Sequence, residues 1–206
     1  MSVNDAPREC GLPIGTMVLT PTGQVPVESL EVGSMVMAVS GDSAPFQAIS
    51  AVRRFRWEGP LVRVRAEALE DGTPQSDLLL LPTQGVLLEG VLVTAGALVD
   101  GLGVVTEPGG TPVQFVQIVL GGHDAVLAAG VAVESVRPHP DAPDCAPRRG
   151  PDASLRAMLS WRAEHMGWVA RRPVQTRPNP GVLRERLEAH PFTAAVPVRP
   201  PFGEPD

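Results

Sequence analysis

Short runs of apolar residues recur along the first two thirds of the chain, separated by turn residues at intervals of roughly ten positions. In residues 61–67, Val62 and Val64 fall on one face and the intervening arginines on the other, a period typical of a strand with one buried face. Strands this short and this often interrupted favour an all-β sandwich or irregular barrel. The predicted strands are residues 17–20, 24–27, 34–40, 61–67, 77–81, 85–88, 91–94, 113–120, 125–128 and 131–136.

The pattern changes after residue 138. In the segment that begins at Asp152, Leu155 and Leu159 recur at helical spacing, which predicts a helix to residue 168 with Asp152 as its N-cap. A second short helix is expected at residues 182–190, followed by a proline-rich, extended end. The predicted organisation is a leader at 1–9, a β domain at 10–138, a proline-rich linker at 139–150, and a helical, proline-rich tail at 151–206.

Composition supports a folded β protein and excludes several classes of function. Of 206 residues, 43% are hydrophobic, and 21 glycines with 23 prolines supply frequent turns. The first 137 residues carry 7 arginines and 15 acidic residues, so nucleic acid is not expected as a partner. The residues after them are only weakly basic, with 10 arginines and 8 acidic residues.

The sequence contains no recognisable targeting signal or cofactor-binding motif. No apolar run reaches the ~18 residues of a membrane span, and the polar first residues are no signal peptide, which leaves the cytoplasm as the default compartment. Cys10 and Cys145 are expected as free thiols, with a single disulfide as the alternative. No phosphate-binding loop or metal-ligand spacing is present, so neither a cofactor nor a metal is expected.

Four segments carry a resemblance to a known family. Cys10 opens a segment ending in Gly-Thr, a strand and turn follow, and then Val-Glu-Ser-Leu-Glu-Val-Gly at 27–33 leads into another strand. Segments in this order resemble the start of a domain of the Hint (Hedgehog/intein) autoprocessing family, in its bacterial branch. Residues 77–88, 95–101 and 117–134 resemble later Hint segments in order and spacing. The resemblance implies a compact all-β horseshoe over about residues 10–138, with the reactive cysteine inside.

The chemistry that the resemblance implies is an acyl shift at the Glu9–Cys10 peptide bond. The Cys10 thiol attacks the Glu9 carbonyl carbon, and the acyl group moves from nitrogen to sulfur. An amide is a poor acyl donor, so the thiol must lose its proton, the oxyanion needs donors and the departing amine needs an acid. In the family, a histidine in a Thr/Ser-x-x-His segment is that acid.

Here that segment departs from the family pattern. Leu81 stands in place of the hydroxyl residue and Gln84 in place of the histidine. Glutamine donates hydrogen bonds but no proton near neutral pH, and losing a general acid typically costs ~10²–10⁴ in rate. The acyl shift is therefore expected to be very slow or lost, with Gln84 able only to polarise the Glu9 carbonyl.

Two further residues fit family positions, each with an ordinary structural alternative. His123 fits a late histidine that assists thioester resolution, or it is a turn residue of the Gly-Gly-His-Asp segment. Asp100 fits an acid that activates a second nucleophile, or it is the first residue of an Asp-Gly turn. Cys10 itself is either the nucleophile or a buried inert thiol.

Two functional hypotheses follow from the sequence. Splicing is excluded because the asparagines, Asn4 and Asn179, are both misplaced for release of the carboxyl side. If the chain is an enzyme, it cleaves its own peptide bond once, with its N-terminal segment as substrate and water or an external thiol as resolving nucleophile. The alternative is an inactive Hint scaffold that binds a protein partner through its tail. The arginines of 53–56 are expected to be a solvated strand face, or otherwise a contact surface.

Overall fold

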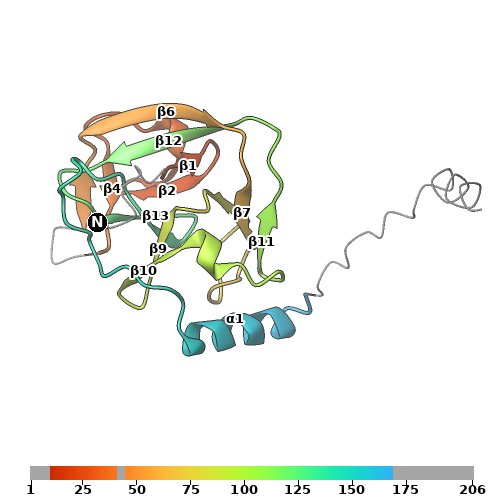
Figure 1. Ribbon diagram of the computed structural model, residues 1–206. Helices are drawn as coiled ribbons and strands as arrows, with labels where there is room; N and C mark the ends of the chain where they lie inside the picture. The colour runs from red at the N-terminus through yellow and green to blue at the C-terminus, as the bar shows by residue number, and fades with distance from the viewer. Residues whose placement is uncertain (1–9, 41–44, 169–206) are drawn as a thin grey trace, which may run out of the picture. The chain divides into compact units, whose positions relative to one another are not determined.

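The computed structural model describes residues 10–40 and 45–168. Within them the chain is built almost wholly of short strands, followed by one α-helix (Figure 1). In chain order the elements are β1 (Leu12–Pro13), β2 (Met17–Thr20), β3 (Gly23–Pro26), η1 (Val27–Ser29), β4 (Met35–Met37), β5 (Phe46–Ala48), β6 (Ala51–Trp57), β7 (Leu61–Val64), β8 (Leu78–Leu80), β9 (Gly85–Leu88), β10 (Val91–Thr94), η2 (Ala95–Leu98), β11 (Val104–Glu107), β12 (Val113–Val119), β13 (Ala125–Ala128), β14 (Val131–Glu134) and α1 (Ala153–His165).

The strands form small antiparallel sheets, and the largest of them joins distant parts of the chain. Its strand order is β10-β9-β14-β13-β2-β3, which brings the first hairpin beside the last one. A second sheet has the order β1-β12-β6, with Leu12 opposite Val116. The long strands β6 and β12 run across the top of the body in Figure 1. This pairing fixes the start of the β domain, and with it Cys10, beside β12.

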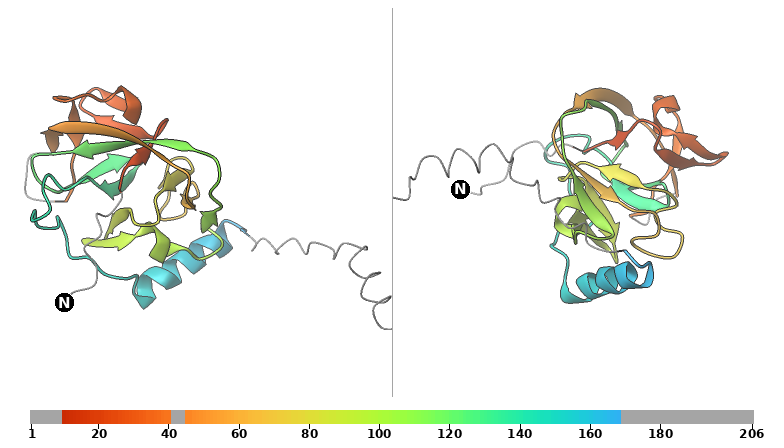
Figure 2. Two further views of the ribbon diagram at one scale, coloured as in Figure 1. Left: turned by 45° about the horizontal axis from the view of Figure 1, so that its top comes forward. Right: turned by 90° about the vertical axis from the view of Figure 1, so that its right-hand side faces the viewer.

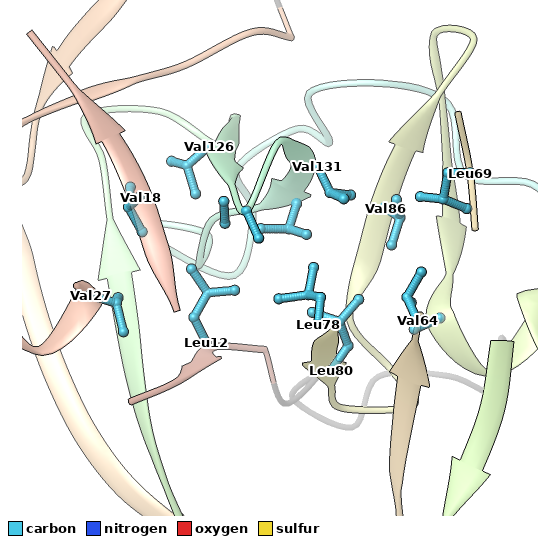
Figure 3. Close-up of a cluster of buried hydrophobic side chains, with 14 of the residues drawn as sticks. Leu12, Val18, Val27, Val64, Leu69, Leu78, Leu80, Val86, Val126 and Val131 are labelled. Atoms are coloured by element: carbon cyan, nitrogen blue, oxygen red, sulfur yellow. The ribbon is translucent and has the colours of Figure 1, made fainter. Parts of the chain in front are cut away.

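The sheets enclose one main hydrophobic core. Apolar side chains from β2, β7, β8, β9, β13 and β14 converge between the sheets, as Figure 3 shows. Val18, Val86 and Leu80 are fully buried there. A smaller cluster of Leu61, Leu81 and Phe115 lies apart from it. Burying apolar surface at about 25 cal/mol per Å² is the main force that holds such short strands together.

Most of the predicted strands are present, with shorter ends. The ranges expected at 17–20, 91–94 and 125–128 coincide with β2, β10 and β13. The strand expected at 34–40 is limited to β4, and β1, β5 and β11 were not predicted. The arginines of β6 are exposed, in agreement with a solvated or contact face. Strands of two to four residues, such as β1, β5 and β11, give too short an alternation to be recognised reliably from sequence.

The helix α1 is shorter than expected and is held to the strands by both apolar and polar contacts. Asp152 caps it as predicted, accepting a hydrogen bond from Leu155 N at 2.8 Å. Leu155 and Leu159 join the main core. Arg162 is 5% exposed, and its guanidinium donates to Glu67 O in the loop after β7 and pairs with Asp71. Figure 2 shows α1 at the margin of the β body from two further sides.

The segment expected as a linker lies against the β body. Leu92 of β10 donates its N–H to Pro147 O, and Arg149 donates its N–H to Leu92 O. We call residues 137–149 the strap, because side chains along it bind groups of the β domain. Among the described residues, no helix is long and apolar enough to cross a membrane. The helix expected at 182–190 lies outside the described residues.

Candidate functional site

Cys10 lies where the first described strand begins, inside the protein. The residue is 6% exposed, and its Sγ lies 4.0 Å from Ser135 O, just after β14. The next residue, Gly11, has a φ of 155°. A Cβ there would lie 3.1 Å from Val116 O and 3.2 Å from the Phe55 ring, closer than side chains usually pack, so this close passage favours glycine. The tight pairing of β1 with β12 therefore places the thiol between β12 and β14.

Two glutamine side chains hold the peptide group that joins Cys10 to Gly11. Gln117 Nε2 donates to Cys10 O at 3.0 Å, and Gly11 N donates to Gln84 Oε1 at 2.7 Å. Gln84 is fully buried, and its Nε2 donates to Glu134 O at 2.9 Å. The segment that carries Gln84 thus faces Cys10, and its carboxamide bridges the start of the β domain to β14.

The Cys10 thiol is held in its protonated form. Burial raises its pKa to about 12, the negative charge of Glu134 adds to the effect, and Arg148 and Arg137 oppose it. Thiolate is the nucleophilic species, and each unit of pKa costs about a factor of ten in its population at neutral pH. This environment reduces the thiolate population of Cys10 by about a thousandfold relative to an exposed cysteine.

A small pocket adjoins the Cys10–Gly11 peptide. Gly11, Ser135 and Val136 contribute to its lining, together with Glu134. It has room for about one water molecule.

Glu134 connects this region to a buried charged cluster. Its Oε1 accepts from Gly85 N at 2.6 Å, and its Oε2 pairs with Arg148 Nη2 at 2.5 Å. Its Oε2 also lies 3.3 Å from His123 Nε2. Asp144 of the strap pairs with both Arg148 and Arg137. The cations lower the pKa of Glu134 below its ordinary value even though burial acts to raise it.

His123 faces the strap, with both ring nitrogens engaged. Cys145 N donates to Nδ1 at 3.0 Å, so the neutral ring carries its proton on Nε2, toward Glu134. Burial acts to lower the pKa of His123. The interactions with the Cys145 side chain and with Glu134 outweigh burial and raise the pKa from 6.5 to about 9. A protonated ring gives up the bond from Cys145 N, and Nδ1 then faces Asp144 Oδ1, 3.5 Å away.

The described residues contain one group of ligand types compact enough for a metal ion. Ligand atoms of His123, Glu134 and Asp144 lie within 4.8 Å of one another. Arg148 occupies both carboxylates, however, and Arg137 also pairs with Asp144. These donors already have cationic partners, so the cluster is an ion-pair network rather than a vacant metal site.

Asp100 lies in a turn of its own, before β11. Its Oδ1 accepts from Leu102 N at 2.7 Å and from Val104 N at 2.9 Å. Within residues 10–40 and 45–168, no hydrogen bond or ion pair joins Asp100 or His123 directly to Cys10. Of the four residues singled out from sequence, the structure therefore brings Cys10 and Gln84 together, and links His123 to them only through Glu134.

The comparison with family models decides the family. The model described as "Hint domain" matches residues 10–140. The chain belongs to the Hint domain family. The match covers the β domain of the described structure, from Cys10, two residues before β1, into the strap, and it agrees with the resemblance found in the sequence.

Solved structures similar to this Hint domain include intein-like proteins. One is a bacterial intein-like domain from Clostridium thermocellum, with 16% identity, covering 62% of this chain and 99% of that chain at a TM-score of 0.48. Another is a DnaB intein from Synechocystis, with 9% identity, covering 62% of this chain and 99% of that chain at a TM-score of 0.49. No curated protein matches the chain.

Three residues of the site were not found by sequence reasoning. Gln117, Glu134 and Arg148 hold the site together, yet each belongs to a common residue type in an ordinary context. Glu134 follows Val133 in β14, and strict alternation would point it to solvent. It is buried because Arg148, far along the chain in the strap, reaches it. A long-range pair of this kind leaves no local signal.

Proposed function

We propose that this Hint domain cleaves its own chain at the Glu9–Cys10 bond by a slow, Cys10-initiated acyl shift. The thiol sulfur bonds to the Glu9 carbonyl carbon, the carbon–nitrogen bond breaks, and the thiol proton ends on the Cys10 amine. Water then hydrolyses the thioester, which releases a segment ending in Glu9 and restores the thiol. The reaction occurs once per molecule.

The observation that carries the proposal is the pair of hydrogen bonds that two glutamine side chains make with the Cys10–Gly11 peptide group. Gln117 and Gln84 fix its carbonyl and its N–H, at 3.0 and 2.7 Å. Both contacts position the residue that bears the nucleophile without using the thiol itself. Such orientation is a recognised source of catalytic rate, because it removes the entropy cost of aligning the reacting groups. The water-sized pocket at Gly11 and Ser135 supports hydrolysis as the resolving step.

Two features of the same site make the reaction slow. Gln84 supplies no proton to the departing amine, which typically costs ~10²–10⁴ in rate. The pKa of Cys10, raised to about 12, leaves little thiolate at neutral pH. The two effects act on different steps, the departure of the amine and the attack of the sulfur, and each lowers the rate of its own step.

The test is intact mass spectrometry of the full chain with a small folded tag ahead of Met1. We expect slow loss of everything before Cys10, faster with added thiol, and capture of the released segment by hydroxylamine as a hydroxamate. The Cys10→Ala variant should not cleave. Cys145→Ala is the matched control, since it removes the other cysteine of the chain, and should cleave like the unmutated chain.

The alternative is an inactive scaffold that binds a partner. One observation favours it: the Gln84 carboxamide is committed on both sides, to Gly11 N and to Glu134 O, and so serves the structure. An unchanged mass after prolonged incubation with thiol and hydroxylamine would overturn self-cleavage and leave this alternative. Cleavage that persists in Cys10→Ala would instead show that another group is the nucleophile.

A further inference from the structure

The strand β6 forms an outer edge of the sheet β1-β12-β6. Within the described residues it pairs with β12 alone, over its whole length of seven residues. It runs along the top of the body in Figure 1. Just before the strand, Ile49 exchanges backbone hydrogen bonds with Gly33 and Ser34. A long strand whose edge lies open beyond such a start is a template for pairing with a further strand.

The hydrogen bonds on the far side of β12 show which groups of β6 face the open edge. Gln114 O accepts from Ile14 N at 3.0 Å, so the backbone of Gln114 faces β1. In an antiparallel sheet, successive residues direct their backbone groups to alternate sides, and directly opposite residues either exchange both bonds or none. Arg56 lies opposite Gln114, so its N–H and C=O point away from β12, as do those of Arg54. Within residues 10–40 and 45–168, no hydrogen bond reaches these outward groups.

Exposed arginines lie along this edge in a domain that is otherwise acidic. The first 137 residues contain 7 arginines and 15 acidic residues, and Arg53, Arg54 and Arg56 are exposed on β6. Arg54 donates to Glu28 O at 3.2 Å. Arg53 and Arg56 have no carboxylate partner among the described residues. The strand therefore presents an uncompensated positive charge on each of its two faces, beside unpaired backbone groups.

We propose that β6 binds an extended acidic segment of another protein, which adds to the sheet as a further strand. The backbone of that segment pairs with the outward groups of Arg54 and Arg56, and its carboxylates pair with the guanidinium groups of Arg53 and Arg56. Phe55 and Trp57 pack against the smaller hydrophobic cluster and hold the strand in place while its edge faces the partner. This surface is distinct from the Cys10 site and from the tail.

Two other occupants fit this edge less well. A second copy of the chain, paired through its own β6, would bring the exposed arginines of two strands together, and like charges on neighbouring strands destabilise their pairing. A nucleic acid would satisfy the arginines, but its phosphates only accept hydrogen bonds and leave the outward C=O groups unpaired. The acidic charge of the domain also repels phosphates. An acidic peptide supplies carboxylates, N–H donors and C=O acceptors together.

The experiment is an NMR titration of the isotope-labelled full chain with a synthetic peptide, acetyl-Thr-Glu-Val-Glu-Glu-Val-Thr-amide. We expect the largest amide shifts in β6, at Arg54 and Arg56. One control peptide carries glutamines in place of the glutamates, and another carries methyl groups on its backbone nitrogens. Each control should bind at least about fivefold more weakly, because it loses either the charges or the donors of the added strand. No shifts in β6 at up to about 1 mM acidic peptide would overturn the proposal.

Two charge-matched variants test the arginines. Arg53→Gln combined with Arg56→Gln should weaken binding of the acidic peptide by about fivefold or more. Arg149→Gln combined with Arg156→Gln is the matched control, because these arginines are exposed in the strap and on α1, and it should bind like the unmutated chain. Unchanged affinity in a folded β6 variant would overturn the proposal. Undiminished binding of the methylated peptide would overturn strand addition whether or not the variant folds.

The same chain tests the other two occupants. Sedimentation without peptide should show a monomer, and a dimer that the β6 variant abolishes would overturn the proposal by assigning the edge to a second copy. A single-stranded oligonucleotide should bind more weakly than the acidic peptide, and tighter binding at β6 would overturn the proposal as well. Cleavage at Glu9–Cys10 leaves β6 in the product, so failure of the proposed self-processing does not affect these results.

Discussion

At the scale of single residues, Gln84 decides how the Hint chemistry can proceed. Its carboxamide occupies the space between Gly11 and Glu134 and is closed to solvent. An imidazole at this position can keep the bond from Gly11 N through one ring nitrogen and carry a proton on the other. Gln84→His is therefore expected to accelerate cleavage at Glu9–Cys10 by tenfold or more, measured as the rate of tag loss by intact mass.

The control for this change is Gln114→His. Gln114 is exposed on β12, the strand that also carries Gln117, so this variant adds a histidine without reaching the thiol. Its cleavage rate should equal that of the unmutated chain. Because Gln84 is shown to contact residue 11, an unaccelerated Gln84→His variant would mean that proton donation to the amine does not limit the rate.

Gly85 is the residue that lets Glu134 approach β9. A Cβ at Gly85 would lie 2.7 Å from Glu134 Cδ and 3.0 Å from Arg148 Nη1, both well inside van der Waals contact. Gly85→Ala must displace the carboxylate, and the expected loss in free energy of unfolding is about 1–3 kcal/mol. Urea denaturation measures it. Gly121→Ala, with no atom within 4 Å of the added Cβ, should change stability little, and equal losses in both variants would contradict this account.

Residue identity in the sequence predicted part of the site but not its geometry. Cys10, Gln84 and His123 were singled out because they stand at motif positions, and Gln84 accepts a hydrogen bond from Gly11 N, in the peptide group that follows Cys10. The network around Glu134 depends on Arg148, beyond the predicted β domain. Contacts between a strand and an irregular segment follow from tertiary packing, which no local pattern encodes.

At the scale of elements, patterning predicted strands better than the connections between them. The hairpins β2–β3 and β13–β14 follow from alternation and turn residues. The strap was expected to be a linker because proline removes backbone donors and discourages strands. It nevertheless packs on β10 through the backbone groups of Pro147 and Arg149, which need no particular side chain.

The docking of α1 depends on one buried arginine. Arg162 donates to Glu67 O through Nε at 3.1 Å and Nη2 at 2.7 Å, and Glu67 has the unusual φ of 62°. Arg162→Ala leaves that carbonyl without its donors, so unfolding free energy should fall by about 1–3 kcal/mol in urea denaturation. Arg156→Ala, on the exposed face of α1, should stay within about 0.5 kcal/mol. A similar loss in both variants would show that the effect does not come from the contact with Glu67 O.

At the scale of the whole molecule, the charged cluster joins the strap to the β domain and makes stability depend on pH. His123 lies between Glu134 of β14 and the strap residues Asp144 and Cys145, with Arg148 beside both carboxylates. Its pKa is raised from 6.5 to about 9, so its charged form stabilises the fold fully below pH 6.5. That contribution is lost as pH rises through about 9. The carboxyl groups of Glu134 and Asp144 act in the opposite direction, because their pKa values are lowered in the folded protein. Their charged forms stabilise the fold at higher pH, and this contribution is lost only in acid.

Between about pH 6 and about pH 8.5, His123 is therefore the group of this cluster whose charge in the folded protein differs most from its charge in the unfolded chain. The free energy of unfolding should fall over this range by an amount on the order of 2–3 kcal/mol, as measured by urea denaturation. Cys10 ionises in the unfolded chain near its ordinary pKa of 9.0 and then also lowers the free energy of unfolding. The measurement therefore ends at about pH 8.5, below that pKa. His123→Gln should flatten the curve, whereas His139→Gln should keep it. A fall of the same size in His123→Gln would place the titrating group elsewhere.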